Sequence, residues 1–579
     1  MQALSDNALR ILKQRYFRRN ERGQVSETPE TLFRRVARAV ASAEGSYGED
    51  PGLWEERFFD LMSQLQFLPN SPTLMNAGIP LGQLSACFVL PVEDKLDGIF
   101  STLRHAALIQ QSGGGTGFNF SHLRPANDPV SDYAGTASGP VSFMKVFDSA
   151  TEHIRQGGKR RGANMGILNI DHPDILAFIT AKRSQGVLRN FNISVGMSDA
   201  FMQALERNAD WPLIHPNSGE AVRHIPAVDI WQELILSAWQ TGDPGLIFLD
   251  AVNRENPTPY LGKIESTNPC GEVPLLPYEP CNLGSLNLPL FVSGGDSPEI
   301  QWDKLAEAVR LSVRFLDNII DINHYIIHPI REMAMGNRKI GLGVMGWADM
   351  LILLGIPYAS HEATELADRL MQFIQDRARE ISEELAQSRA PFPNWQAGHF
   401  AGGKPLRNAT RTSIAPTGTI SIIAGVSSSI EPLFALAFQR MHVLQDETMD
   451  SVNGHFVEYL NRHGLFSNDI LQRVIAEGTC AGIHELPDQV RQLFATAPEI
   501  APSWHLEHQL AFQRHTDNAV SKTINLPASA TPDMVNDIYR AAWKRGAKGI
   551  TIFRDQSTVS QVLQRGINPG TDPCRVCVE

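Results

Sequence analysis

Short apolar runs alternate with long helical patterns over most of the chain. Two long segments, 305–320 and 363–386, repeat apolar residues with the period of a helix. Around them lie short runs with the composition of buried strands, at 86–90, 191–195, 339–343, 412–415 and 549–553. Strands that alternate with helices over roughly 480 residues predict an α/β architecture with mostly parallel strands.

The two ends of the chain differ from this middle part. Thr28 and Pro29 form an N-cap followed by proline at the first helical position, and Leu32, Val36 and Val40 continue an apolar stripe. The polar end of the chain, which contains Gly and Pro, is typical of a flexible tail. We therefore predict three parts: an N-terminal helical region at 1–65, an α/β region at 66–556 and a C-terminal tail at 557–579.

Composition and charge exclude several classes of protein. The chain has 579 residues, of which 42% are hydrophobic and 20% charged, as in ordinary globular proteins. A formal net charge of −12 argues against a surface that coats DNA or RNA, because such surfaces are basic. The N-terminus lacks the pattern of a secretory signal, and no run approaches the roughly 18 apolar residues of a membrane span. We expect a cytoplasmic protein without a membrane partner.

The cysteines favour redox or catalytic chemistry. There are six of them: Cys87, Cys270, Cys281, Cys480, Cys574 and Cys577. In a cytoplasmic chain, catalytic thiols or metal ligands are more common than a disulfide framework. A structural zinc site needs four ligands, usually in two close pairs. Only Cys574 and Cys577 form a close pair, with no histidine nearby, so we predict no protein metal site.

The segment Asn268-Pro269-Cys270-Gly271-Glu272 sets a thiol between an amide and a carboxylate. If it is extended, these three side chains at alternate positions point to one face. That arrangement suits chemistry on a hydroxylated substrate. The alternative is a cysteine-bearing loop whose Asn and Glu bond to local backbone. The five residues alone leave both interpretations open.

Three glycine-rich segments could hold a ligand. Residues 112–119 let the backbone approach a ligand closely, although a tight packing turn has the same composition. Residues 156–164 add three cations, which suits phosphates or a solvated basic loop. Residues 415–421 follow a strand-like run and carry hydroxyls, as expected of an anion site at a helix N-terminus.

Together these motifs resemble, in their order, the catalytic chain of a ribonucleotide reductase. The similarity covers roughly 68–553 and the tail. The motifs that carry it are Ser71-Pro72-Thr73-Leu74-Met75-Asn76-Ala77-Gly78, Leu84-Ser85-Ala86-Cys87, Gly113-Gly114-Gly115-Thr116-Gly117, Asn268-Pro269-Cys270-Gly271-Glu272, Cys281-Asn282-Leu283-Gly284-Ser285-Leu286-Asn287-Leu288, Pro416-Thr417-Gly418-Thr419-Ile420 and the terminal Cys574-Arg575-Val576-Cys577.

The resemblance implies a fold and an activity. The fold is a ten-stranded α/β barrel, built from two five-stranded parallel halves, with Cys270 on a central finger loop. Residues 66–556 would form this catalytic barrel. The activity is reduction of ribonucleoside diphosphates to 2'-deoxyribonucleoside diphosphates by a thiyl radical, which supplies precursors of DNA.

The resemblance also implies roles for individual side chains. Cys270 would become the thiyl radical that removes hydrogen from C3' of the ribose. Glu272 would accept the 3'-hydroxyl proton, and Asn268 would bind the ribose hydroxyls. Cys87 and Cys281 resemble the dithiol that reduces the substrate and ends as a disulfide.

Further roles follow from the same resemblance. Cys574 and Cys577 resemble a shuttle pair that re-reduces the site and is renewed by a thioredoxin- or glutaredoxin-type reductant. Cys480 matches no family role, and we interpret it as structural. The implied substrate-binding residues are Ser71, Ala86, Gly114, Gly115, Pro416, Thr417, Gly418, Thr419 and Ile420.

The radical source is inferred by comparing the classes of this family. Classes served by a separate diiron subunit resemble one another in carrying adjacent tyrosines near the last strand, and residues 548–554 contain none. Glycyl-radical relatives carry a glycyl segment and a four-Cys zinc site, which the tail lacks. The class that uses adenosylcobalamin remains. The alternatives are a large chain needing a separate radical-generating subunit, a radical enzyme for another substrate, and a degenerate nucleotide-sensing homologue.

The resemblance extends to regulation. Family members form dimers and bind a second nucleotide, dNTP or ATP, at the dimer interface. By position, Asp94 and Arg124 resemble its contacts, and a loop with Lys182, Arg183 and Gln185 resembles the relay to the substrate. Residues 1–65 are short for an ATP-cone domain, so we do not expect overall on/off control by ATP and dATP. The tail is also shorter than in many cobalamin-dependent members.

Overall fold

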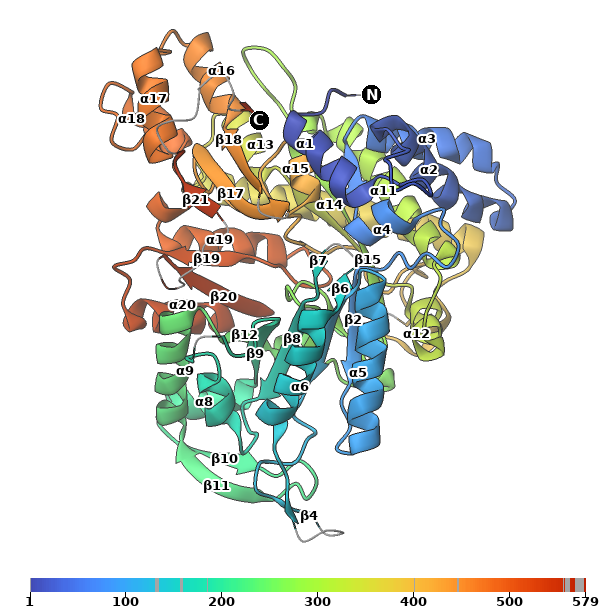
Figure 1. The fold of residues 1–579 in the computed structure, drawn as a ribbon, viewed down its shortest axis with the longest axis vertical. Helices are drawn as coiled ribbons and strands as arrows, with labels where there is room; N and C mark the ends of the chain where they lie inside the picture. The colour runs from blue at the N-terminus through green and yellow to red at the C-terminus, as the bar shows by residue number, and fades with distance from the viewer. Residues whose placement is uncertain are drawn as a thin grey trace.

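The computed structural model describes residues 2–130, 135–156, 160–184, 186–399, 401–444, 447–555, 557, 563–567 and 577–578 (Figure 1). At its centre is a ten-stranded sheet. Its strands are β1 (Phe67–Pro69), β2 (Cys87–Pro91), β3 (Gly115–Asn119), β8 (Asn164–Asn169), β9 (Phe191–Met197), β12 (Gly245–Phe248), β15 (Pro280–Asn287), β16 (Ile340–Met345), β19 (Thr523–Leu526) and β20 (Gly549–Arg554). All five strand segments expected from the apolar runs lie in this sheet or bridge to it.

The sheet closes into a barrel with two parallel halves. Strands β2, β3, β8, β9 and β12 run parallel to one another. In the other half β15 pairs parallel with β16, and β19 with β20. The segment 412–414 joins these two pairs, because Thr412 bridges Leu342 and Ile414 bridges Val520, both in parallel. The halves meet antiparallel at β2–β15 and β12–β20. The predicted barrel of two five-stranded halves is confirmed, with β1 added at its edge.

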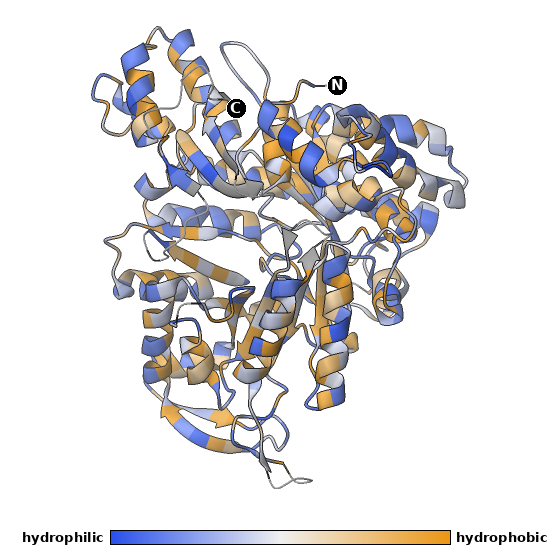
Figure 2. Cartoon of the chain, viewed as in Figure 1, coloured by the Kyte–Doolittle hydropathy of each residue, from blue (hydrophilic) through white to orange (hydrophobic). Residues whose placement is uncertain are grey.

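Helices cover the outside of both halves (Figure 1). Those of the first half are α5 (Leu96–Gln111), α6 (Pro140–His153), α7 (Ile175–Thr180), α8 (Asp199–Glu206), α9 (Ala227–Thr241) and α10 (Leu249–Arg254). The second half carries α11 (Trp302–Ile322), α12 (His328–Asn337), α13 (Trp347–Leu353), α14 (His361–Arg389), α15 (Ile420–Ala424), α19 (Pro502–Gln513) and α20 (Pro532–Lys544). Two large apolar cores lie beneath the helices, one centred on the first half and extending to β19, β20, α19 and α20, the other formed by the rest of the second half and the N-terminal helices. Figure 2 shows hydrophobic residues gathered on the strands and on one side of the covering helices.

The N-terminal helices pack against the second half of the barrel. They are α1 (Asp6–Ile11), the π-helical turn η1 (Leu12–Tyr16), α2 (Pro29–Ala41), η2 (Ser42–Tyr47), α3 (Pro51–Ser63) and α4 (Ser71–Asn76). Thr28 caps α2 as expected, its hydroxyl accepting from Thr31 N at 3.3 Å. The buried carboxylate of Glu44 pairs with Arg314 on α11 and Arg389 on α14, each at 2.6 Å. These contacts fix the helical region to the barrel.

Several elements were not expected from the sequence. They are the hairpins β4 (Pro129–Val130) with β5 (Gly135–Thr136), β6 (Arg155–Gln156) with β7 (Arg160–Arg161), β10 (Asp210–Ile214) with β11 (Ala221–Pro226) and β17 (Ala437–Leu444) with β18 (Glu447–Val452), and the helices α16 (Gly454–Arg462), α17 (Asn468–Glu477) and α18 (Asp488–Leu493). The last three helices enclose Cys480 in a small separate core, which agrees with a structural role for that thiol. Within the described ranges, no helix has the length and apolarity needed to span a membrane.

Candidate active site

A narrow hairpin carries the Asn268–Glu272 segment at its tip. Its two sides, β13 (Ser266–Thr267) and β14 (Pro274–Leu275), pair antiparallel. Both halves of the barrel hold the tip. From β9, Asn192 Nδ2 donates to Pro269 O at 2.7 Å. From the other half, Ser413 Oγ and Ala519 N donate to the backbone oxygen of Glu272 at 2.9 and 2.8 Å. The hairpin is thus a finger loop inside the barrel.

The tip is a turn rather than an extended segment. Asn268 Oδ1 accepts from Val273 N at 3.0 Å, and Asn268 O accepts from Gly271 N at 3.1 Å. Gly271 has φ +82°, a left-handed conformation that favours glycine. The extended geometry that would point three alternate side chains to one face does not occur. Instead the turn exposes Cys270 and buries Asn268 and Glu272.

Glycines on β3 make room for the finger loop. A Cβ atom on Gly117 would lie 1.7 Å from Thr267 O, and one on Gly115 would lie 2.9 Å from Pro269 Cγ. A Cβ on Gly114 would meet two buried side chains at 2.6 Å. Close packing therefore explains these glycines in the structure. Contact of Gly114 and Gly115 with substrate stays a prediction.

Cys87 and Cys281 are neighbours on adjacent strands, at the seam where the two halves of the barrel meet. They are registered partners in the antiparallel pair β2–β15, and both are buried. Directly opposed residues have Cβ atoms about 4.5–5.5 Å apart, a spacing close to that of a disulfide. Neither is in a disulfide here. Asn268 Nδ2 donates to Cys87 Sγ at 3.2 Å, which ties this pair to the finger loop.

Glu272 is a buried carboxyl with few partners. Only 3% of the residue is exposed, and Oε2 has no hydrogen-bond partner among the described residues. Burial raises its pKa to about 7, although hydrogen bonding by Asn268 and by its own backbone amide opposes the rise. A carboxyl with this pKa changes charge near neutral pH and can act as a general base.

The buried thiols are held in the protonated form. Burial raises the pKa of Cys87 well above its usual value, and the nearby Glu272 carboxylate, Cys281 and Cys270 add to the rise. Burial likewise raises the pKa of Cys281, while the Lys339 ammonium lowers it. Two neutral thiols beside a carboxyl suit donation of protons and hydrogen to a substrate.

Two segments predicted to hold substrate, at Ser71 and at 416–420, are linked by hydrogen bonds to a third segment, η1. Tyr16 OH lies 2.7 Å from the Oγ of Ser71 at the start of α4. Arg15 Nη1 donates to the Oγ1 of Thr419, which precedes α15, at 3.4 Å. Arg15 and Tyr16 were not predicted from the sequence, because nothing local in that helix indicates contacts with residues so far along the chain.

The remaining predicted substrate residues surround this region. Pro416 lines a cavity that also contains Cys270. Thr417 has φ +55° and its Oγ1 accepts from Ser429 N at 2.7 Å. Gly418 faces open space, and Ala86 packs on the apolar cluster that contains both buried thiols. Ile420 begins α15 and is buried.

The cavity beside Cys270 has a volume of about 440 Å³. Backbone and side chains of β9, β12 and β20 form its walls, with Gln509 and Lys522 among the polar groups. Its β20 wall runs from Gly549 to Phe553, a stretch without tyrosine. Cys270 lines this cavity, whereas Cys87, Cys281 and Glu272 are not among its lining residues, so a group placed in the cavity can reach the exposed thiol.

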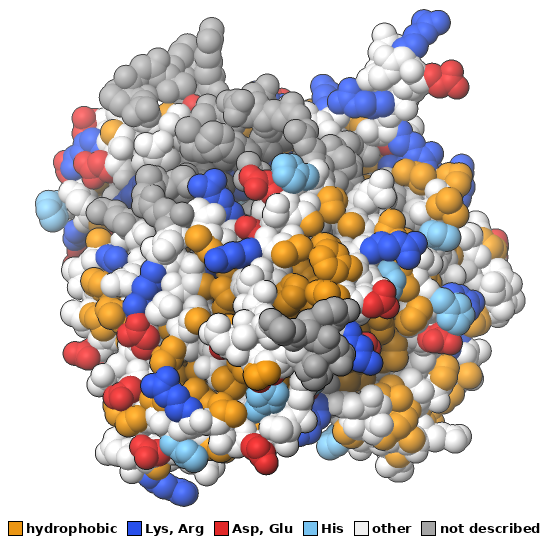
Figure 3. All heavy atoms as spheres, turned by 60° about the horizontal axis from the view of Figure 1, so that its bottom comes forward, with side chains coloured by type: hydrophobic (Ala, Val, Ile, Leu, Met, Phe, Trp, Pro, Cys, Tyr) orange, Lys and Arg blue, Asp and Glu red, His pale blue; other side chains and the backbone are white. Residues whose placement is uncertain are grey.

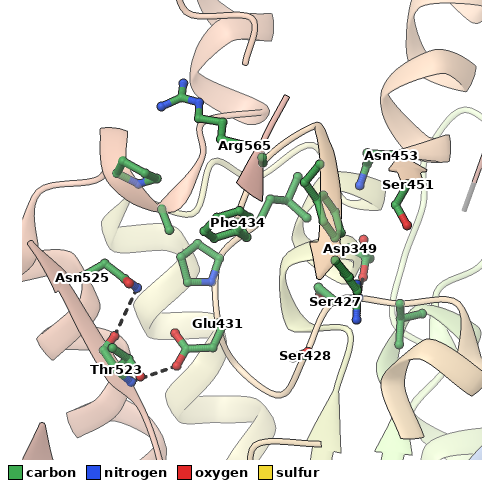
Figure 4. Close-up of a pocket in the computed structure, with 18 of the residues that line it drawn as sticks. Asp349, Ser427, Ser428, Glu431, Phe434, Ser451, Asn453, Thr523, Asn525 and Arg565 are labelled. Carbon is green, nitrogen blue, oxygen red and sulfur yellow. Dashed lines mark hydrogen bonds between the residues drawn. The ribbon is translucent and has the colours of Figure 1, made fainter. Parts of the chain in front are cut away.

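A second cavity, of about 570 Å³, adjoins the first (Figure 4). The two share Glu431, Thr523 and Phe553. At this junction Glu431 Oε1 accepts from Thr523 N at 2.8 Å, and the other carboxylate oxygen pairs with Lys522. The second cavity is lined mainly by apolar groups, with Phe434 near the centre of Figure 4 and Asn453 and Asn525 offering amides.

Two of the residues predicted for effector binding contact each other. Arg124 Nε lies 2.8 Å from Asp94 Oδ2, and Arg124 N donates to Asp94 Oδ1 at 3.1 Å. Asn217 Nδ2 donates to the same carboxylate at 2.7 Å. Asp94 lies just before α5, so the pair marks one end of that helix.

The predicted relay loop contacts the first cavity. Lys182 Nζ pairs with Asp243 at 2.8 Å, and Asp243 lines the cavity beside Cys270. Arg183 pairs with Glu233 on α9 at 2.5 Å. Gln185 lies outside the described residues. Of the predicted shuttle pair, Cys574 also lies outside them, while the backbone of β22 (Cys577–Val578) pairs parallel with β18.

Comparison with known proteins gives a consistent picture. A family model described as "Ribonucleotide reductase, barrel domain" matches residues 85–553, and one described as "Ribonucleotide reductase, all-alpha domain" matches residues 2–82. A protein of Mycobacterium tuberculosis strain CDC 1551, named vitamin B12-dependent ribonucleoside-diphosphate reductase, is 50% identical over 568 residues, covering 97% of this chain and 80% of that protein.

More distant proteins match as well. A protein of the same name from Thermoplasma acidophilum is 46% identical over 621 residues, covering 97% of this chain and 80% of its own length. The solved structure of the Actinobacillus ureae class Id ribonucleotide reductase alpha subunit superimposes with a TM-score of 0.76 at 22% identity, over 96% of this chain and 99% of that one. At that identity the structural match supports the fold alone.

Proposed function

This chain belongs to the ribonucleotide reductase family, and we propose that it reduces ribonucleoside diphosphates to 2'-deoxyribonucleoside diphosphates with adenosylcobalamin as its radical source. The observation that supports this most strongly is the position of Cys270. It lies at the tip of the finger loop, where it lines a cavity and is near enough to the buried Cys87 to influence the pKa of that thiol, as do Cys281 and Glu272. An anaerobic assay with adenosylcobalamin, a nucleoside diphosphate and dithiothreitol tests the proposal directly.

The chain's residues fit the cofactor. The two adjoining cavities together offer an apolar chamber with amide groups, which suits a large ring bearing amide arms, and the smaller one opens on Cys270. Phe434, Asn453 and Asn525 would hold the ring, and Gln509 with the Glu431–Lys522 pair would face the adenosyl group. When bound, adenosylcobalamin supplies the radical that removes the hydrogen atom of the Cys270 thiol. The adjacent tyrosines expected of chains that are served by a separate diiron subunit are absent from the described β20 wall, which favours this source over a separate radical-generating subunit.

On the buried side, each residue has a defined task. Ser71 and residues 416–420 hold the substrate, and Asn268 orients the ribose through its amide. The thiyl radical of Cys270 takes the hydrogen from C3', and Glu272 accepts the 3'-hydroxyl proton. Burial of Glu272 keeps its proton affinity high enough for this transfer near neutral pH.

Cys87 and Cys281 complete the reduction. One thiol protonates the departing 2'-hydroxyl, the pair supplies two electrons, and the product state is a Cys87–Cys281 disulfide. Their register as opposed partners on β2 and β15 allows that bond with little movement. Presence of Cys270, Glu272 and this dithiol argues against a nucleotide-sensing homologue, and the dithiol argues against a radical enzyme for another substrate.

The tail cysteines should serve only the protein reductant. In a Cys574→Ser, Cys577→Ser variant we expect multiple turnovers with thioredoxin or glutaredoxin to stop. A single turnover by pre-reduced enzyme and steady turnover with dithiothreitol should persist, because a small dithiol reaches the buried disulfide without a shuttle. Measurement of the deoxynucleotide formed per enzyme molecule by chromatography distinguishes multiple turnovers from a single turnover. Loss of the single turnover would show that the pair is not a shuttle.

The dimer is proposed from the surface of the first half of the barrel. Leu96, Phe100 and Val146, on α5 and α6, are 65%, 52% and 37% exposed. Figure 3 shows hydrophobic side chains gathered on the face of the molecule to which this half contributes. Such a patch suits association with a second copy. Effector nucleotides, dNTP or ATP, would bind beside it at Asp94 and Arg124.

Arg124 and Arg183 should affect regulation differently. Arg124→Ala should weaken effector binding by roughly 1.5–3 kcal/mol, the cost of a charged hydrogen bond. Arg183→Ala should leave effector affinity unchanged but weaken the selection of the substrate base by the effector. The substitution removes the Arg183–Glu233 pair and loosens a loop whose Lys182 pairs with Asp243, a residue that lines the Cys270 cavity. A Gln185→Ala variant should behave like Arg183→Ala.

Effector titration by calorimetry and competing-substrate assays under dTTP, dGTP or dATP measure the two effects. Unchanged base preference in both loop variants would show that residues 182–186 are not the relay. Unchanged effector affinity in Arg124→Ala would remove that residue from the effector site.

A further inference from the structure

A row of side chains crosses the barrel wall at the level of the buried thiols. In the sheet register Cys87 lies opposite Cys281 on one side and opposite Gly115 on the other. On the far side of Cys281, the parallel ladder pairs Asn282 with Ile340, which places Lys339 level with Cys281. Laterally paired residues point to the same face of a sheet. Gly115 faces the finger loop, so this face is the barrel interior.

The ammonium of Lys339 is buried within this row. Lys339 Nζ lies 2.7 Å from Glu279 Oε2, and each side chain is 1% exposed. Asn337 Nδ2 donates to Glu279 Oε1 at 2.7 Å, and Leu276 N donates to Oε2 at 2.9 Å. Glu279 is therefore held by three donors, and its carboxylate is near enough to Cys281 to influence the pKa of that thiol. A buried cation is thereby fixed beside one of the two thiols.

The two thiols consequently have different electrostatic surroundings. Around Cys281, after burial, the charge with the largest influence on the pKa is the Lys339 ammonium, ahead of the Glu279 and Glu272 carboxylates. Around Cys87, the charge with the largest influence is the Glu272 carboxylate, which raises the pKa, while the hydrogen bond from the Asn268 amide lowers it. The charge with the largest influence at Cys281 is thus a cation, which favours a thiolate, whereas that at Cys87 is a carboxylate, which opposes one.

We propose that Lys339 is a positioning residue that makes Cys281 the leaving thiolate when the Cys87–Cys281 disulfide is reduced, so that the incoming thiol bonds to Cys87. This deepens the proposed function, since it assumes that the two cysteines form a redox couple. The buried cation set level with Cys281 by the sheet register is the observation that carries it.

The exchange is balanced with the reductant's two thiols. The first thiolate attacks Cys87 Sγ, forming a mixed disulfide and breaking the Cys87–Cys281 bond, and Cys281 leaves as a thiolate beside Lys339. The second thiolate of the reductant then attacks the first sulfur of the reductant, which is bonded to Cys87 in the mixed disulfide. The bond to Cys87 breaks, and Cys87 is released as a thiolate. Both released thiolates take up protons. Two electrons pass from the reductant to the site, and the reductant ends as a disulfide. Exchange is faster when the leaving thiol has the lower pKa.

The first experiment maps the attacked sulfur. Full-length enzyme oxidised to the Cys87–Cys281 disulfide is treated briefly with 2-mercaptoethanol, quenched with iodoacetamide and analysed by peptide mass spectrometry. We expect the mercaptoethanol adduct on Cys87 and the alkyl group on Cys281. The opposite pattern, or equal labelling of both, would overturn the proposal. This test uses the unmodified sequence, so it does not depend on the folding of a variant.

The second experiment removes the charge. Lys339→Met should slow reduction of the disulfide at pH 7 by roughly three- to ten-fold. It should also shift the pH profile of the exchange upward and reduce the preference for Cys87. Lys339→Arg should restore rate and selectivity. Lys548→Met is the matched control, because Lys548 is also buried and pairs with a carboxylate, that of Glu255 at 2.5 Å, but is not among the groups with the largest influence on either thiol. A purely structural loss would lower Tm without changing which sulfur is attacked.

The outcomes separate this inference from the proposed function. Failure of pre-reduced enzyme to form a Cys87–Cys281 disulfide during one turnover would contradict the redox couple itself. Formation of the disulfide, with an unchanged pH profile and unchanged selectivity in folded Lys339→Met, would refute only the role of Lys339.

Discussion

Replacement of Cys270 with alanine is expected to abolish deoxynucleotide formation, with a loss of roughly 10⁴-fold or more. The thiol is the one group at the tip of the finger loop that faces the cavity and can carry an unpaired electron to the substrate side. Substrate affinity should stay nearly unchanged. The turn itself is closed by hydrogen bonds from Gly271 N to Asn268 O and from Val273 N to Asn268 Oδ1.

Anaerobic product analysis and calorimetric titration with a nucleoside diphosphate measure the two quantities separately. Cys480→Ala is the matched control, since that thiol is buried among α16–α18, outside the barrel. It should retain full turnover, with a modest loss of stability from the small cavity. Measurable deoxynucleotide from purified Cys270→Ala would falsify the assignment of the thiyl radical.

The fold was largely predictable because its signals are local. Apolar runs of strand length, bounded by helices, predict β2, β9, β16 and β20, and the Thr28 cap predicts α2. The number of strands and the closure of the barrel came from the family resemblance. The strand-like run at 412–415 was predicted, but closure depends on the isolated bridges that Thr412 and Ile414 make to different neighbours, and no local pattern indicates that pairing. The hairpins and α16–α18 were missed, since their short amphipathic segments resemble loops between larger elements.

The sequence motifs named candidate residues for the site but did not predict how those residues are arranged. Alternation of Asn268, Cys270 and Glu272 suggested an extended segment, but Gly271 at positive φ and the Asn268 side chain produce a turn. Cys87 and Cys281 are far apart in the chain, so the register of β2 and β15 is what reveals that they are directly opposed.

Other contributors were missed for the same reason. Arg15 and Tyr16 reach Thr419 and Ser71 through contacts of long sequence separation. Lys339 precedes an apolar strand and has no distinguishing neighbour in sequence. The role proposed for it rests on the parallel ladder, which sets it level with a thiol. Sequence motifs thus locate chemical groups, while the closed sheet determines which of them act on one another.

Glu272→Gln should lower turnover by roughly 10²–10⁴-fold, the usual contribution of a general base. The amide keeps the size of the side chain but cannot accept the 3'-hydroxyl proton. In the unsubstituted enzyme the rate should rise with pH through about 7, because Glu272 must be ionised to act. The variant should lack this limb of the pH–rate profile. Glu265→Gln, which changes a partly exposed carboxylate paired with His122, is the matched control and should keep it.

Stability gives an independent check on the same carboxyl. Its pKa in the folded protein, about 7, is above the ordinary value of 4.5. The stability that protonation provides is therefore complete below about pH 4.5 and is lost as the pH rises through about 7. Glutamine is neutral throughout, so the variant should be more stable than the parent at pH 8, by roughly 3 kcal/mol or a Tm rise of about 2–3 °C, and equally stable near pH 4.5. Equal melting temperatures at pH 8, together with a surviving acidic limb in Glu272→Gln, would exclude Glu272 as the base, because a buried carboxyl that titrates near neutrality must produce both effects.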